Sequence, residues 1–240
     1  MLFKLSLRLR GGHIYQIDIQ HILSKYSIDI KYIQKGVVYM KTIVFVSEKG
    51  GVGKTRLADE LYYFYQRTGV PVSLYSFDGQ YKNKTVDKKA DNPAVAVVDT
   101  PGRLMDDKTV QTLQGADLVV IPTRPTAGNI ESFTRTVALV KSNVSCPIFL
   151  VVNCGNRFVA ARSFMEWLDG YMKKVNLDLV MTIPHSELMV QAEAYSCSAV
   201  EINRHAPAAF AVSRFCERAS RLAGIPVTEP QTTSKKLVAK

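Results

Sequence analysis

The stretch that decides the fold is Ser47–Thr55, which reads SEKGGVGKT. It joins an apolar, β-branched run, expected as a strand over Thr42–Ser47, to a helical pattern over Lys54–Arg67. Glycines in such a junction let backbone N–H groups converge on phosphate oxygens, and the helix N-terminus adds the positive end of a dipole. The stretch therefore predicts a phosphate-binding loop between a strand and a helix.

Each residue type in this loop has an expected role. Lys54 should reach the β and γ phosphates of a nucleotide, and the Thr55 hydroxyl should bind Mg²⁺. Glu48 departs from the general pattern, because a glycine normally opens G-x-x-x-x-G-K-[ST]. The backbone contacts to phosphate are expected from Gly50, Gly51, Val52 and Gly53.

From Lys41 onward, short apolar runs alternate with longer amphipathic stretches, which is typical of βαβ units. Most of the runs are apolar throughout, as strands covered on both faces must be. The sequence thus predicts an α/β fold of the P-loop NTPase kind, a mainly parallel twisted sheet with helices on both faces. The expected strands are Thr42–Ser47, Val72–Phe77, Ala94–Asp99, Asp117–Ile121, Pro147–Asn153 and Leu179–Ile183.

Three segments are expected along the chain. Residues 40–224 form the nucleotide-binding domain, whose last helix should start near Pro207 and end near Gly224. Residues 225–240 are a basic tail with little to bury. In residues 1–39, alternation around Leu5 and Leu7 favours a hairpin, while a strand beginning directly after Met40 favours translation starting there.

Composition limits the classes of partner and site. Lysine and arginine total 31 against 21 acidic residues, a net charge of +10 that favours polyanions but also serves solubility. The four cysteines lack C-x-x-C spacing, so neither a zinc ribbon nor a redox pair is indicated. No signal peptide and no apolar run of about 18 residues is found, so a cytoplasmic location without stable membrane insertion is expected.

Residues Lys49–Thr55, KGGVGKT, resemble the deviant Walker A box of the ParA/MinD family of ATPases. The resemblance implies that the cofactors are ATP and Mg²⁺ and that ATP drives formation of a homodimer. It makes Lys49 the signature lysine, which reaches the partner's nucleotide, and adds Arg56, at the place of a second threonine, to the nucleotide contacts. The short interval between Asp78 and Ala94 makes the chain most similar to small plasmid partition or stability ATPases.

Two aspartates complete the expected hydrolysis and metal site. Asp78, in the segment SFDGQ, resembles the second aspartate of the family's D-x-D-P-Q segment, although Ser76 replaces the first. Asp99 ends the run AVAVVD before Thr-Pro-Gly and resembles the family's Walker B and switch II segment. The expected catalytic residues are Lys49, Lys54 and Asp78, and the expected metal ligands are Thr55, Asp78 and Asp99. Either aspartate could instead be an ordinary turn residue.

Two later residues match the family's base-binding positions. Asn153, at the end of FLVVN, is placed like the residue that reads adenine, although asparagine is also a common turn former. Pro184, in the Ile-Pro turn at residues 183 and 184, is expected to line the base pocket or the dimer face.

Arg214, Arg218 and Arg221 recur at helical spacing on the last predicted helix, a pattern suited to sequence-independent contacts with DNA phosphates or to a solvated face. The leading interpretation is a slow, partner-stimulated ATPase of plasmid partition or stability, associated with the nucleoid and linked in some way to conjugation. Its partners would be non-specific DNA and a DNA-bound adaptor, ParB-like or a small centromere-binding protein. The alternatives are a MinD-like membrane-associated positioning ATPase and an ATP-dependent small-molecule ligase or kinase.

Overall fold

The computed structural model describes residues 4–8, 14–18, 40–76, 88–102, 107–156 and 158–226. The chain divides into two compact units, residues 1–39 and 40–240, and each is described by itself. In the first unit, β1 (Lys4–Arg8) pairs antiparallel with β2 (Ile14–Asp18), the pairing that the alternating sequence favours.

The second unit is built around a sheet of six strands in the order β4-β5-β3-β6-β7-β8, and every pairing in it is parallel. The six predicted strands are confirmed, with ends that shift by at most two residues. The strands are β3 (Lys41–Phe45), β4 (Val72–Ser76), β5 (Val95–Asp99), β6 (Leu118–Thr123), β7 (Ile148–Gly155) and β8 (Val180–Pro184).

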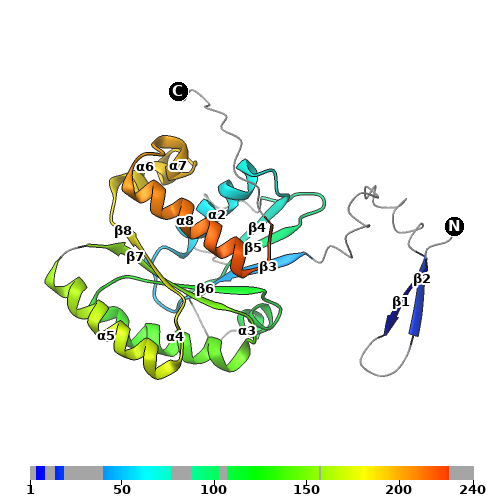
Figure 1. Cartoon of the computed structure of the whole chain (residues 1–240), viewed down its shortest axis with the longest axis horizontal. Coiled ribbons are helices and arrows are strands. Elements are labelled where there is room, and N and C mark those ends of the chain that lie inside the picture. The colour runs from blue at the N-terminus through cyan, green and yellow to red at the C-terminus, as the bar shows by residue number, and fades with distance from the viewer. Residues whose placement is uncertain are drawn as a thin grey trace. The chain divides into compact units, whose positions relative to one another are not determined.

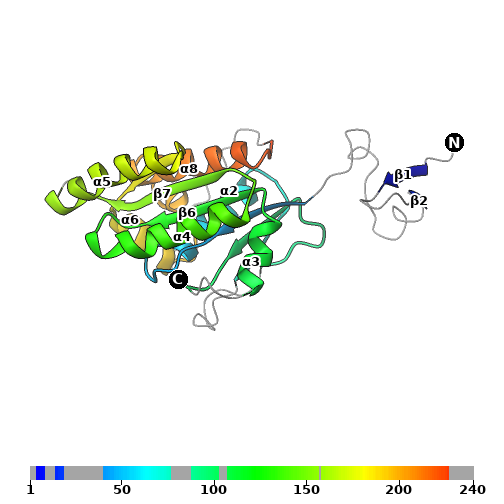
Figure 2. The same ribbon diagram turned by 90° about the horizontal axis from the view of Figure 1, so that it is seen from below.

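Helices cover both faces of this sheet, as predicted. One face carries α2 (Lys54–Arg67), α6 (Glu187–Ala194), α7 (Ala199–Ile202) and α8 (Pro207–Leu222) (Figure 1). The other carries α3 (Asp107–Gln114), α4 (Ile130–Asn143), which follows the 3-10 turn η3 (Ala127–Asn129), and α5 (Val159–Val175). Figure 2 shows α4 and α5 from below, with α4 lying over β6.

Alternation along the buried strands creates two separate cores. Ile43 and Phe45 of β3 face α2 and α8, whereas Val44 between them faces the α3, α4 and α5 side. On the first side Phe215 of α8 stacks on Phe149, with ring centroids 5.9 Å apart. On the second side Trp167 of α5 stacks on Tyr171 at 5.2 Å. Burial on both faces is what makes these strands apolar throughout.

The ends of α2 and α8 agree with the sequence. Helix α2 spans the predicted residues and ends before Gly69, whose φ is +71°. Helix α8 has Pro207 in its first turn, where the missing N–H is not needed. The predicted tail begins at residue 225, yet Ile225 is buried in the core, and residues 227–240 lie outside the described part.

Candidate functional site

Topology brings three strand ends together at the carboxyl edge of the sheet. Phe45, Ser76 and Asp99 lie side by side in the register of β3, β4 and β5. From β3 the chain runs to β4 and β5 on one side of the sheet, and it later crosses to β6 on the other side. The position between the adjacent strands β3 and β6 is therefore a topological switch point. The loop after β3 therefore lies where ligands bind in open α/β sheets.

The loop between β3 and α2 has the backbone of an anion cradle. Gly51 and Gly53 have φ values of +73° and +99°, conformations that favour glycine. Gly53 is also the N-cap of α2, where no side chain caps the first turn. The N–H groups of that turn lack helical partners and point outward, so they suit a phosphate group.

Lys54 and Thr55 extend from the first turn of α2 into this cradle. Lys54 is 7% exposed, and its Nζ donates a hydrogen bond across the loop to the Ser47 carbonyl oxygen at 3.2 Å. The Thr55 hydroxyl donates to Asp99 Oδ2 at 2.6 Å, and Asp99 is 1% exposed. A hydroxyl and a carboxylate in contact are hard oxygen ligands, so this pair fits Mg²⁺ bound together with phosphate oxygens.

A metal held by protein side chains alone is not indicated. Among the described residues, no group of three or more His, Cys, Asp or Glu side chains is arranged to bind an ion. Mg²⁺ commonly takes only one or two protein ligands and completes its shell with phosphate and water. The Thr55 and Asp99 pair matches that mode of binding.

Asn153 supports the loop from β7, which lies two strands from β3 in the sheet. It is 7% exposed, its Nδ2 donates to the Val52 carbonyl oxygen at 3.0 Å, and its Oδ1 accepts from the Cys154 N–H at 3.0 Å. A Cβ at Gly53 would lie 2.2 Å from that Nδ2 atom. The contacts of Asn153 thus fix the phosphate loop, and its role in reading adenine stays a prediction.

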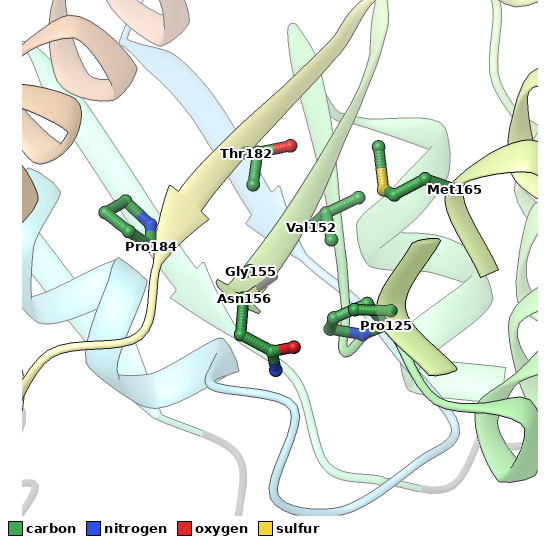
Figure 3. A pocket seen from close by; sticks show the side chains of 8 residues that line it. Pro125, Val152, Gly155, Asn156, Met165, Thr182 and Pro184 are labelled. Atoms are coloured by element: carbon green, nitrogen blue, oxygen red, sulfur yellow. The ribbon is translucent and has the colours of Figure 1, made fainter. Parts of the chain in front are cut away.

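A pocket of about 370 Å³ opens two residues beyond Asn153, at the ends of β7 and β8. Figure 3 shows Pro184 and Pro125 on opposite sides of it, with Gly155 and Asn156 between them and Thr182 and Met165 above. Apolar walls with a few polar groups are typical of small-molecule pockets. Pro184 thus lines a cavity at these strand ends, and its role in a base pocket or a dimer face stays a prediction.

Comparison with known families decides the assignment. The CobQ/CobB/MinD/ParA nucleotide-binding domain family matches residues 43–196, which include the loop, Asp99, Asn153 and Pro184. The chain belongs to this family. No curated protein matches the chain by sequence.

Solved structures of ParA/MinD proteins share the fold. McdA from Cyanothece superimposes with a TM-score of 0.62 at 16% identity, covering 75% of this chain and 99% of that one. A chain of the MinC:MinD cell division protein complex from Aquifex aeolicus gives 0.60 at 18% identity, with 80% and 100% covered. A Borrelia burgdorferi protein described as a plasmid partition protein, bound to AMPPNP, gives 0.57 at 16% identity, with 77% and 98% covered. These likenesses confirm the predicted fold.

The ParA/MinD-type site differs from the prediction at Arg56. Its side chain is 9% exposed, pairs with Glu60 one turn along α2 and donates to the Cys197 carbonyl oxygen at 3.0 Å. Glu60 is fully buried and accepts from the Ser198 hydroxyl and from the Ala199 N–H, the latter at 2.8 Å. The Arg56 side chain therefore joins α2 to the start of α7 rather than lining the phosphate loop.

The same loop has a partner that sequence reasoning missed. Arg135 of α4 binds both carboxylate oxygens of Glu48, at 2.9 Å each, and also pairs with Glu131. The Glu48 N–H donates to the Thr136 hydroxyl at 3.2 Å. Glu131 and Arg135 lie four residues apart on one helix, but nothing in that spacing points to a residue 87 positions away.

The remaining predicted residues fall into three groups. Lys49 is exposed, and its contact with a partner's nucleotide stays a prediction. Asp78 lies outside the described residues. Of the three arginines on α8, Arg214 and Arg221 are exposed, whereas Arg218 lies over the Phe149 ring at 5.4 Å and donates to the Val180 carbonyl oxygen at 3.4 Å. Arg218 thus packs against the sheet instead of joining an open basic ridge.

Among the described residues, no helix is long and apolar enough to cross a membrane.

Proposed function

We propose that this protein hydrolyses ATP in the presence of Mg²⁺, and that ATP binding favours a homodimer. The observation that carries the proposal is the contact between Thr55 and Asp99 at 2.6 Å, beside a loop in which Gly51 and Gly53 adopt left-handed conformations. Those features supply the oxygen ligands and the N–H groups that a nucleotide with its metal needs.

The chain's residues divide the work of the reaction. The loop amides and Lys54 hold the phosphates and stabilise the charge that develops during transfer, the main task in phosphoryl transfer. Mg²⁺, when bound at Thr55 and Asp99, would neutralise charge on the phosphate oxygens. Asp78 follows the end of β4 by two residues, and Ser76 pairs in register with Asp99. We assign Asp78 the orientation of the attacking water.

The biological role that we propose is plasmid partition or stability, through ATP-dependent, non-specific binding to DNA and contact with a DNA-bound adaptor. The net charge of +10 and the exposed Arg214 and Arg221 support contact with a polyanion. The Borrelia burgdorferi protein described as a plasmid partition protein, bound to AMPPNP, has a fold similar to that of this chain. The proposal includes an association with the nucleoid in the cytoplasm.

The hydrolysis proposal is tested with three variants and one assay. Lys54→Ala should abolish ATP binding, because it removes the cation that meets the phosphates. Asp78→Ala should leave binding intact and remove most turnover, measured as phosphate release. Thr55→Val should raise the Mg²⁺ concentration needed for turnover. If Lys54→Ala binds and hydrolyses ATP as the wild type does, the assignment of this loop is wrong.

The DNA proposal has a separate test. Binding to a random duplex should require ATP, fall steeply with added salt and weaken when Arg214 and Arg221 are both changed to glutamate. Arg218 is left unchanged because it contacts Phe149 and Val180. Anionic vesicles form the second arm: ATP-dependent binding to vesicles, with none to DNA, would replace partition by a membrane role.

A further inference from the structure

Glu48 places a carboxylate in a loop that has to accept a polyanion. It occupies the position where the general phosphate-loop pattern has glycine, and Lys49 and Gly50 follow it directly. Its side chain is 32% exposed, so solvent screens the charge only in part. Like charges repel, so a Glu48 carboxylate without a counterion would weaken the binding of ATP to this loop.

Arg135 is placed to compensate that charge. Its Nε and Nη2 atoms each lie 2.9 Å from a different oxygen of Glu48, the fork geometry in which guanidinium binds carboxylate most specifically. Glu131 pairs with the remaining Nη1 atom, and at 84% exposed it lies largely in solvent. The guanidinium group is therefore bound by two carboxylates, through Nε and Nη2 to Glu48 and through Nη1 to Glu131.

The backbone of Glu48 is fixed from the same helix and from the segment after β5. Thr136, fully buried on α4, accepts a hydrogen bond from the Glu48 N–H and donates one to the Ser132 carbonyl oxygen at 2.8 Å. A Cβ at Gly102 would lie 3.3 Å from the Glu48 carbonyl oxygen, so this segment packs closely on the loop. Helix α4 thereby sets where the phosphate loop begins.

We propose that Arg135 is a positioning residue of the nucleotide site, which neutralises the Glu48 carboxylate and holds the first turn of the phosphate loop so that it accepts a triphosphate. The inference rests on the proposed function, since it assigns a role in ATP binding. It explains why this chain tolerates glutamate where the pattern has glycine: the acid is acceptable because α4 supplies its counterion.

The test measures the Kd of ATP, ADP and AMP, with Mg²⁺, for the wild type and for Arg135→Gln. Loss of the guanidinium should weaken ATP on the order of three- to tenfold at low ionic strength, with a smaller loss for ADP and the smallest for AMP. The loss should shrink with added salt. The double variant Glu48→Gln/Arg135→Gln should return the ATP affinity to within about twofold of the wild type, because both charges are gone.

Arg135→Lys separates charge from geometry. Lysine keeps the positive charge but lacks the planar fork of arginine. The affinity of the Arg135→Lys variant for ATP should therefore lie between those of the wild type and of Arg135→Gln. Lys173→Gln is the control, since Lys173 pairs with Asp169 at 2.8 Å on α5 and is exposed, at 77% against 51% for Arg135. That variant loses the same charge on a helix surface and should bind ATP as the wild type does.

Two results would overturn this inference and leave the proposed function standing. One is an Arg135→Gln variant that binds ATP as the wild type does. The other is a variant that loses affinity for ATP, ADP and AMP equally and is not rescued by Glu48→Gln, which would indicate a structural defect. A wild-type protein that fails to bind ATP would instead overturn the proposed function, and the inference with it. Because exposed ion pairs add little stability, all these variants should fold, which urea unfolding verifies.

Discussion

Replacing Gly53 by alanine tests how the phosphate loop is held. Gly53 has a φ of +99°, and an added Cβ would lie 2.2 Å from Asn153 Nδ2. Two separate penalties follow. The left-handed conformation costs an alanine about 1–2 kcal/mol. Displacing the buried Asn153 amide breaks its bond to Val52 and costs about 1–3 kcal/mol more.

Together these penalties predict that Gly53→Ala lowers the free energy of unfolding by roughly 2–5 kcal/mol. Two comparisons separate the terms. Gly51→Ala shares a positive φ of +73° but meets nothing within 4 Å, so it should lose only about 1–2 kcal/mol from backbone strain. Gly50→Ala has neither problem and should change stability by less than about 0.5 kcal/mol.

The assay is urea unfolding of the wild type and of each variant, with ATP affinity measured in parallel. Asn153→Ala combined with Gly53→Ala removes the obstructing amide, so the double variant should lose less than the sum of the two single losses. If Gly53→Ala is no less stable than Gly51→Ala, or if the two losses add fully, the close contact between Gly53 and Asn153 does not exist as described.

Three further predictions concern charged and polar groups that are buried or half-buried. Glu60→Ala should lower the free energy of unfolding by about 3–5 kcal/mol, because it leaves the Arg56 cation buried without its carboxylate; the double variant Arg56→Met/Glu60→Leu should recover only part of the loss in the same urea assay, because the Ser198 hydroxyl and the Ala199 N–H still lack their acceptor. Burial raises the pKa of the Tyr65 phenol above its usual value. As the pH rises, the unfolded chain therefore releases this proton before the folded protein does, and the free energy of unfolding should fall above about pH 10. Tyr65→Phe should make this alkaline loss of stability shallower, measured by unfolding at a series of pH values. Arg218→Ala should lower the thermal midpoint by a few degrees, roughly 1 kcal/mol from the contact with Phe149, whereas the exposed Arg221→Ala should not; equal midpoints would place Arg218 on the open surface.

The sequence by itself determined the fold and the position of the phosphate loop. Glycines, Lys54 and Thr55 lie within one short stretch, and the apolar runs around them alternate with helical patterns, so the information is local. Helix α2 was predicted with its observed bounds because Gly69 and Pro71 end it by backbone geometry alone. Asp99 could be placed at the site because parallel strands end at the same edge.

The tertiary structure alone decided which distant side chains pair with the charged groups of the domain. Glu48 meets Arg135 across 87 residues, and Glu60 meets Ser198 across 138. Arg56 and Arg218 show the limit of local reasoning, since each matches a nucleotide-binding or DNA-binding pattern yet contacts other parts of the domain. The physical reason is that a motif fixes the backbone near itself, whereas the partner of a charge depends on how distant helices pack against the sheet.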